Sequence, residues 1–284
     1  MQHRIPPTMD IKNEIRPGQS VELLKELHIL TRDGRMNQDS RRKLKQVYHL
    51  YNFIEPLLIE LQQASPVIRL VDLGAGKSYL GFILYDLFFK GLKSESHIIG
   101  IESRDELVEK SRVLAEKLGF GGMAFLNQTV VDTLGSTELP ATIDIVTALH
   151  ACNIATDDAI RFALQKQAKF IVLVPCCQSE VAATLKKNKG MVLAKTIVEL
   201  WRHPIHTREF GSHVTNVLRC LQLEAHGYQV SVTELVGWEH SMKNELIIAR
   251  RGNQPDRRRA QRLHELLAML GLEELRERFF TPAD

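Results

Sequence analysis

The sequence predicts an α/β fold of the Rossmann-like type, with a seven-stranded, mostly parallel sheet, helices on both faces and an antiparallel last strand. From Ile68 onward, short apolar runs alternate with amphipathic segments of helical length, which is the pattern of a parallel sheet built from βα units. The last two apolar runs, residues 228–237 and 244–251, are joined by only the six residues WEHSMK. This link is too short for a crossover helix, so these two strands are expected to be antiparallel.

The expected elements follow one another along the chain. Strands are expected at residues 68–74, 97–102, 123–131, 143–149 and 169–175, before the closing pair. Helices are expected at residues 20–30, from Asp39 or Ser40 to Leu61, at 78–89, at 104–119, from the cap Thr156 onward, and at 214–227. Gly119 and Gly227 end two of these helices as C-caps.

These elements divide the chain into three parts. Residues 1–38 are expected to form an N-terminal arm, residues 39–252 the α/β domain with its leading basic helix, and residues 253–284 a basic tail. The tail is expected to carry one amphipathic helix, at residues 261–280. The chain between the fifth strand and the 214–227 helix is longer than one crossover needs, which predicts an insertion at about residues 178–211.

Composition narrows the class of protein. Apolar residues make up 44% and charged residues 25% of the chain, as in ordinary globular domains. The four cysteines include no CxxC pair, which argues against a disulfide framework or a zinc ribbon and favours a reducing cytoplasm. No apolar stretch approaches the length of about 20 residues that a membrane span needs, so a soluble protein without membrane contact is expected.

A glycine turn follows the first expected strand. The segment V-D-L-G-A-G-K, residues 71–77, ends the strand and opens a helix, so Gly74, Ala75 and Gly76 offer backbone N–H groups to a ligand. A GxG turn also suits dinucleotides and ordinary tight turns, but a dinucleotide turn more often has a third glycine where this chain has Tyr79.

An acidic residue ends the second expected strand at the distance of one βαβ unit. Glu102 lies about thirty residues past the glycines, where a carboxylate can accept both hydroxyls of a ribose. The alternative is a solvated acid at a strand end. After the third strand, the segment from Thr129 to Asp132 is expected to border an adenine, with either side chain facing the ring.

Two unusual segments follow the fourth and fifth expected strands. They are A-L-H-A-C-N, residues 148–153, and V-P-C-C-Q-S, residues 174–179. These strands are neighbours in a doubly wound sheet, so both segments should emerge at its carboxyl edge, where ligands bind. An acceptor molecule is expected between them.

Together these motifs resemble a group of class I methyltransferases with D-x-G-x-G-K, L-H-x-C and P-C-C motifs, which includes tRNA 2′-O-methyltransferases of the acceptor stem. The resemblance covers Leu70 to about Val181 and the closing strand pair. It implies a Rossmann-like fold and S-adenosylmethionine as the cofactor. It further implies that Asp72 holds the methionine ammonium group. The cofactor's methyl group is then expected to point between residues 149–151 and 175–176, with Leu149 among the cofactor-binding residues.

Three residues of these segments are candidates for catalysis. His150 suits a general base near neutral pH, or alternatively a hydrogen-bonding bracket at the strand end. Asn153 suits the orientation of an acceptor base, or a turn. Cys176 suits a thiolate nucleophile, although packing around the acceptor pocket is favoured for it. A metal held by His150, Cys152 and a cysteine of the pair is disfavoured, because adjacent cysteines rarely share one ion, so no metal is predicted.

Basic clusters make RNA the expected acceptor. They are Arg41 to Lys45, then Lys186, Lys187 and Lys189, then Arg257 to Arg262. If they share the face that holds His150, they form a track for a phosphate backbone, and if they are scattered, they only aid solubility. The expected insertion adds cations and a stacking surface for a base, in Trp201, His203, His206 and Arg208.

Two other functions fit the same motifs. A protein or small-molecule methyltransferase would show a closed apolar acceptor pocket on the same scaffold. A non-catalytic Rossmann domain that binds RNA or a partner would have lost its cofactor contacts, but the glycines and Glu102 are all present. The oligomeric state is left open.

Overall fold

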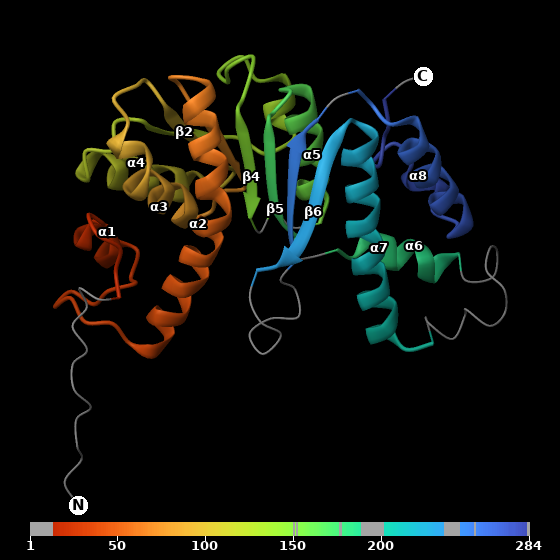
Figure 1. The fold of residues 1–284 in the computed structure, drawn as a ribbon. Helices are drawn as coiled ribbons and strands as arrows, with labels where there is room; N and C mark the ends of the chain where they lie inside the picture. Colours follow the sequence, from red (N-terminus) through yellow and green to blue (C-terminus); the bar gives the residue numbers. More distant parts are fainter. Residues whose placement is uncertain are drawn as a thin grey trace, which may run out of the picture.

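The computed structural model describes residues 14–149, 151, 153–175, 178–188, 202–235, 245–252 and 254–282. Seven strands form one sheet in the order β3-β2-β1-β4-β5-β7-β6 (Figure 1). The strands are β1 (Arg69–Leu73), β2 (His97–Glu102), β3 (Met123–Asn127), β4 (Ile145–Leu149), β5 (Phe170–Val174), β6 (Tyr228–Glu234) and β7 (Glu245–Arg251). The first five are parallel, and β7 is antiparallel to both β5 and β6, as the short link predicted.

Helices cover both faces of this sheet. The α-helices are α1 (Val21–Glu26), α2 (Gln38–Ala64), α3 (Tyr79–Leu87), α4 (Asp105–Lys117), α5 (Ile154–Gln165), α6 (Glu180–Lys187), α7 (Pro204–Ala225) and α8 (Arg257–Met269). Short 3-10 helices are η2 (Phe89–Gly91), η3 (Asp132–Gly135) and η5 (Glu273–Leu275).

The period of two in each strand sorts side chains between two cores. In β1, Leu70 packs with residues of α1, α2, α3 and α4. Val71 and Leu73 point to the other face, where α5 and the end of α7 cover the sheet. Every residue of β5 is buried, as expected for a strand covered on both faces.

A third core lies beyond the edge of the sheet. It joins α6, α7, α8 and the C-terminal segment through Leu185, Leu218, Leu267 and Phe279. Figure 1 shows α8 alongside α7, away from the strands. The residues after Gly252 therefore pack against the domain. They do not form one continuous helix over 261–280, because α8 ends at Met269 and Gly271 takes a φ of +65°.

Three helix starts differ from the sequence prediction. The N-cap of α2 is Asn37, whose side chain accepts the Ser40 N–H, so neither Asp39 nor Ser40 caps it. Helix α5 begins at Ile154, and the Thr156 hydroxyl donates to the Ala151 carbonyl. Helix α7 begins at Pro204, well before residue 214, because proline suits the first helical position.

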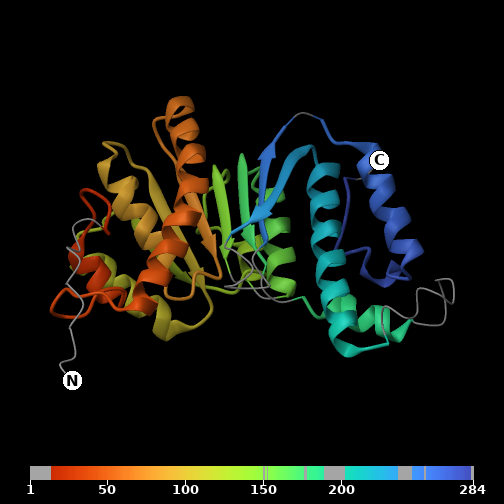
Figure 2. The same ribbon diagram turned by 60° about the horizontal axis from the view of Figure 1, so that its bottom comes forward.

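The parallel strands set the direction of the molecule. Strands β1, β2, β4 and β5 all end at the same edge of the sheet. This is the lower edge of the sheet in Figure 1, and it is turned toward the viewer in Figure 2. Helix α2 lies on one side of this carboxyl edge, and α6 and α7 lie on the other (Figure 2). Ligands of such sheets bind at this edge.

Candidate functional site

The glycine turn after β1 has the backbone conformation that only glycine adopts easily. Gly74 has a φ of +68° and Gly76 a φ of +59°. Between them, the Ala75 N–H donates to the Ile101 carbonyl at 2.9 Å, which ties the turn to β2. A Cβ on Gly74 would lie 3.7 Å from the Ala151 Cβ, so the turn also contacts the segment after β4.

Asp72 lies just before this turn and is 3% exposed. Its Oδ1 accepts a hydrogen bond of 2.6 Å from the Thr147 hydroxyl of β4, the residue paired with it in the sheet. Burial raises the pKa of Asp72 to about 6, although this hydrogen bond lowers it. A buried carboxylate of this kind is suited to receive a cationic group.

Glu102 joins the end of β2 to the glycine turn. Its Oε2 accepts the Gly76 N–H at 2.8 Å, and its Oε1 accepts the Arg104 N–H at 3.0 Å and the Arg104 Nε at 2.9 Å. Burial favours the neutral acid, but these hydrogen bonds outweigh burial and lower the pKa of Glu102. The acid is therefore ionised beside the turn, and the more exposed Arg104 side chain shields it from solvent.

Thr129 and Asp132 lie after β3 and bind each other. The Asp132 Oδ2 accepts the Thr129 hydroxyl at 2.6 Å and the Thr129 N–H at 3.0 Å, and these bonds lower the pKa of Asp132. Between them, Val131 is 55% exposed at the carboxyl edge. The sequence prediction took Val131 as part of the strand, and its exposed apolar side chain is a further candidate to contact an adenine.

The segments after β4 and β5 approach each other in their described residues. Asn153, with φ +52° and ψ −116°, is the N-cap of α5, and its Oδ1 accepts the Ser179 N–H at 3.2 Å. Leu149 ends β4, half-buried, and Ala151 is buried against the glycine turn. The other candidates, His150, Cys152, Cys176, Cys177, Lys189 and Trp201, lie outside the described residues.

Sequence reasoning missed a buried polar network behind these segments. Arg219 of α7 donates to Asp157 and to the Asn153 carbonyl, and Gln178 binds Asn216 of the same helix. The one available signal was an arginine on the apolar face of the helix expected at residues 214–227.

Comparison with known proteins identifies the domain. A protein-family model described as a methyltransferase domain matches residues 42–184, half of the chain. The chain belongs to this methyltransferase-domain family. The matched region includes the glycine turn, Glu102 and the described residues of both later segments. The region is thus an S-adenosylmethionine-dependent methyltransferase domain, as its motifs predicted.

More distant likenesses extend over more of the chain. A protein of Mus musculus named glutathione S-transferase C-terminal domain-containing protein is 26% identical over 76% of this chain and 34% of its own length. Its Drosophila melanogaster homolog is 26% identical over 74% of this chain and 36% of its own. The chain thus spans about a third of these relatives. A Podospora anserina methyltransferase bound to S-adenosylhomocysteine superposes with a TM-score of 0.47 at 13% identity, over 84% of this chain and 89% of its own.

The residues of the methyltransferase domain fit the cofactor that its family implies. The positive φ of Gly74 and Gly76 is the conformation of a turn that lets backbone approach a ligand. The N–H groups of Ala75 and Gly76, which were predicted to face the ligand, instead donate to Ile101 and Glu102. The ionised Glu102 suits the two ribose hydroxyls, and the buried Asp72 suits the ammonium group. Bound by these residues, S-adenosylmethionine would supply an electrophilic methyl group.

The three basic clusters do not share one edge of the sheet. Because β7 runs against β5, it ends at the amino edge, where the Arg251 N–H donates to the Lys169 carbonyl at 2.8 Å. Arg257 to Arg262 begin α8 there, and Arg259 pairs with Glu224 at the far end of α7. This cluster therefore lies away from the acceptor segments, and a track including all three clusters is excluded.

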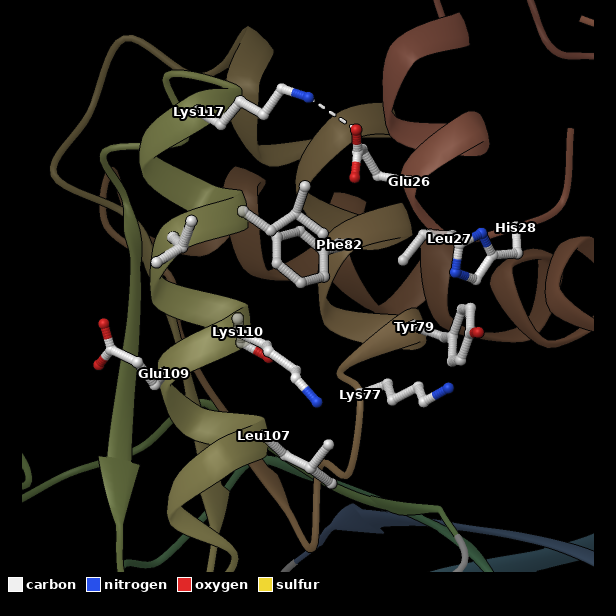
Figure 3. Close-up of a pocket in the computed structure, with 13 residues that line it drawn as sticks. Glu26, Leu27, His28, Lys77, Tyr79, Phe82, Leu107, Glu109, Lys110 and Lys117 are labelled. Atoms are coloured by element: carbon white, nitrogen blue, oxygen red, sulfur yellow. Dashed lines mark hydrogen bonds and ion pairs between the residues drawn. The ribbon is translucent and has the colours of Figure 1, made fainter. Parts of the chain in front are cut away.

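A separate cavity of about 480 Å³ lies between α1, α3 and α4. Figure 3 shows Phe82 and Leu107 on its walls, with Lys77, Tyr79 and Lys110 around them. None of its described lining residues was predicted as a site residue, although Lys77 ends the glycine-turn segment. It lies on the outer helical face, away from the segments after β4 and β5.

The described part of the chain offers neither a metal cluster nor a membrane-spanning helix. There, no group of three or more histidine, cysteine, aspartate and glutamate side chains is arranged to hold a metal ion. His150 and the cysteines proposed as ligands lie outside it, so the metal prediction stays a prediction. None of the described helices combines the length and apolar character that a bilayer crossing demands.

Proposed function

We propose that this methyltransferase domain methylates RNA. The proposal depends on two basic clusters on opposite sides of the carboxyl edge. Arg42, Lys43 and Lys45 are exposed at the start of α2, which extends past that edge (Figure 1). Lys186 and Lys187 are exposed on α6, which follows β5 directly. Cations on both sides of a site suit the phosphates that flank a target nucleotide.

The described contacts support a division of roles. The glycine turn, Asp72 and Glu102 hold the cofactor, and Thr129 or Asp132 borders its adenine. In this arrangement the acceptor nucleotide lies between residues 149–151 and the segment after β5, near Leu149 and Pro175. His150 takes the proton of the acceptor atom, as the sequence predicted, and Asn153 and Cys176 line the same space. The protein works in the reducing cytoplasm, where its thiols stay free.

The experiment compares modified nucleosides in total RNA from cells with and without the gene, by mass spectrometry. Purified protein with tritiated S-adenosylmethionine then has to restore the missing nucleoside on RNA from the deletion cells. If RNA is the acceptor, one methylated nucleoside should be missing from the RNA of the deletion cells. It should return when that RNA is treated with the purified protein. An unchanged nucleoside profile, with label appearing in protein or small molecules, would overturn the RNA proposal and leave the methyltransferase domain in place.

A further inference from the structure

Arg219 is a charged side chain in the interior, with 1% of its surface exposed. Its Nε donates to the Asp157 Oδ1 at 2.6 Å, its Nη1 to the Asn216 Oδ1 at 3.3 Å, and its Nη2 to the Asn153 carbonyl at 3.0 Å. Burial of a charge is costly unless the group is paired and fully hydrogen-bonded, and often adds little to stability. The planar guanidinium fork instead fixes three partners in one geometry.

These partners connect both segments that flank the acceptor space. Asn153 ends the β4 segment, and its side chain also binds the Ser179 N–H of the β5 segment at 3.2 Å. Asn216 accepts from the Gln178 Nε2 at 2.8 Å, and donates to Glu245 at the start of β7 at 2.7 Å. One helix, α7, thus holds the described ends of both segments. Arg219 binds the β4 segment directly, and Asn216, to which Arg219 also donates, binds Gln178 of the β5 segment together with Ser212.

The C-terminal segment enters the same network. Arg278 lies 3.5 Å from the Asp157 Oδ2 and pairs with Glu180 in the first turn of α6. Asp157 lies in the first turn of α5, so Arg278 joins the starts of the two helices that leave these segments. Phe279, next along the chain, is fully buried in the third core and anchors Arg278 there.

We propose that Arg219 is a positioning residue for the acceptor side of the site, and that Arg278 makes the C-terminal segment part of that arrangement. This inference rests on the proposed methyl transfer, and it names what sets the spacing of the two acceptor segments. Among the described residues, no hydrogen bond or ion pair joins the glycine turn or Glu102 to this network, and only the packing of Ala151 against the turn lies between them. We therefore expect cofactor affinity to change little when the network is altered.

The test uses Arg219→Lys, Arg278→Gln and Arg259→Gln in the full chain. Arg219→Lys keeps the charge opposite Asp157 but loses the fork that reaches Asn153 and Asn216. Arg278 is less buried than Arg219, and Arg278→Gln removes only the ion pairs from the C-terminal segment to Asp157 and Glu180. Arg259→Gln is the matched control, because it removes another ion pair between the C-terminal region and α7, with Glu224 at the opposite edge.

Three measurements separate the outcomes. We expect the dissociation constant for S-adenosylhomocysteine to stay within about twofold in all three variants. We expect kcat on RNA from deletion cells to fall at least about tenfold in Arg219→Lys, less in Arg278→Gln and not in Arg259→Gln. Alkylation rates of Cys152, Cys176 and Cys177 can be mapped by mass spectrometry. They should change several-fold in Arg219→Lys, and less or not at all in the other two variants. Burial raises the pKa of Cys220 to about 12, so this thiol should react slowly, but it adjoins Arg219 and its rate is read separately from the other three.

Unchanged thiol rates and turnover in Arg219→Lys would overturn the inference, as would an equal loss of cofactor binding, which would show a general structural role. Failure of RNA as acceptor has a different signature. Wild-type protein then labels no RNA, while the thiol rates still separate Arg219→Lys from Arg259→Gln and decide the positioning role independently.

Discussion

At the scale of single residues, the proposed cofactor side has two carboxyl groups whose pKa values are shifted in opposite directions. Glu102 receives several N–H donors, which lower its pKa, whereas Asp72 has one hydroxyl donor and burial raises its pKa to about 6. Two acids of the same site therefore titrate in different pH ranges.

The pKa of Asp72 predicts how cofactor affinity depends on pH. A ligand ammonium group favours the ionised acid, so below pH 6 binding has to displace a proton. We expect calorimetric titration with S-adenosylhomocysteine to show about tenfold weaker binding at pH 5 than at pH 7. Asp72→Asn should bind weakly at both pH values. A pH-independent affinity of the wild type would contradict the role of Asp72.

The same group predicts a stability effect of opposite sign. The folded protein holds the Asp72 proton up to about pH 6, above the ordinary value of 3.8, so the unfolding free energy falls as pH rises between these values. At pH 7, Asp72→Asn should raise the unfolding free energy by about 3 kcal/mol. Urea unfolding without cofactor at pH 4 and pH 7 measures this, and the gain should be small at the lower pH.

A substitution at Gly74 separates cofactor binding from backbone strain. Gly74→Val and Gly119→Val both place a β-branched residue at a φ of +68°, so both are strained. We expect only Gly74→Val to abolish S-adenosylhomocysteine binding, because its side chain would project from the glycine turn toward Ala151 of the segment after β4. His150→Ala should keep the wild-type affinity and lower turnover by at least about 100-fold. Loss of binding in His150→Ala would contradict this division of roles.

At the scale of elements, the helices after β5 form a unit with their own core. Helices α6, α7 and α8 contribute to it, and Phe279 closes it with no exposed surface. The chain of this unit leaves the sheet after β5, and α7 then packs back against the sheet at β6. Residues around the acceptor segments are therefore supported from outside the sheet.

Truncation of Phe279 should show that the C-terminal segment stabilises the domain. Phe279→Ala leaves a cavity in the third core, and we expect it to lower the unfolding free energy by about 3 to 5 kcal/mol. Met269→Ala, on the exposed side of α8, should change it by less than about 1 kcal/mol. Urea unfolding followed by circular dichroism measures both. Equal, small effects would mean that the segment is only loosely attached.

At the scale of the whole molecule, charge is distributed unequally between the two edges of the sheet. The carboxyl edge has cations of α2 and α6 on its two sides, and the arginines that begin α8 lie at the opposite edge. The net charge of +3 is small, so local placement decides where a polyanion binds.

Charge reversal tests this placement with a matched pair of variants. Arg42→Glu/Lys45→Glu should raise the KM for RNA at least about fivefold and make RNA binding less dependent on salt, because fewer phosphate contacts form. Arg257→Glu/Arg258→Glu makes the same change of charge at the amino edge and should have little effect. Equal effects of both double variants, seen by filter binding across a salt series, would indicate a non-specific polyanion surface.

The sequence by itself determined the fold class, the antiparallel closing pair and the glycine turn after β1. These depend on local rules: the period of two in strands, the length of a link, and the conformational freedom of Gly74 and Gly76. Glu102 was found because a βαβ unit fixes its distance along the chain from the glycines. Helix starts were less well determined, since Asn37 and Pro204 compete with nearby residues that also suit a helix terminus.

Only the tertiary structure decided what surrounds the acceptor segments. Arg219 meets Asp157 across 62 residues of chain, and no periodic pattern predicts which buried polar groups will face each other. The antiparallel course of β7 placed Arg257 to Arg262 at the far edge, although in sequence they are simply another basic run. Periodicity and turns act between near neighbours in the chain, whereas the pairing of distant side chains depends on how whole elements pack.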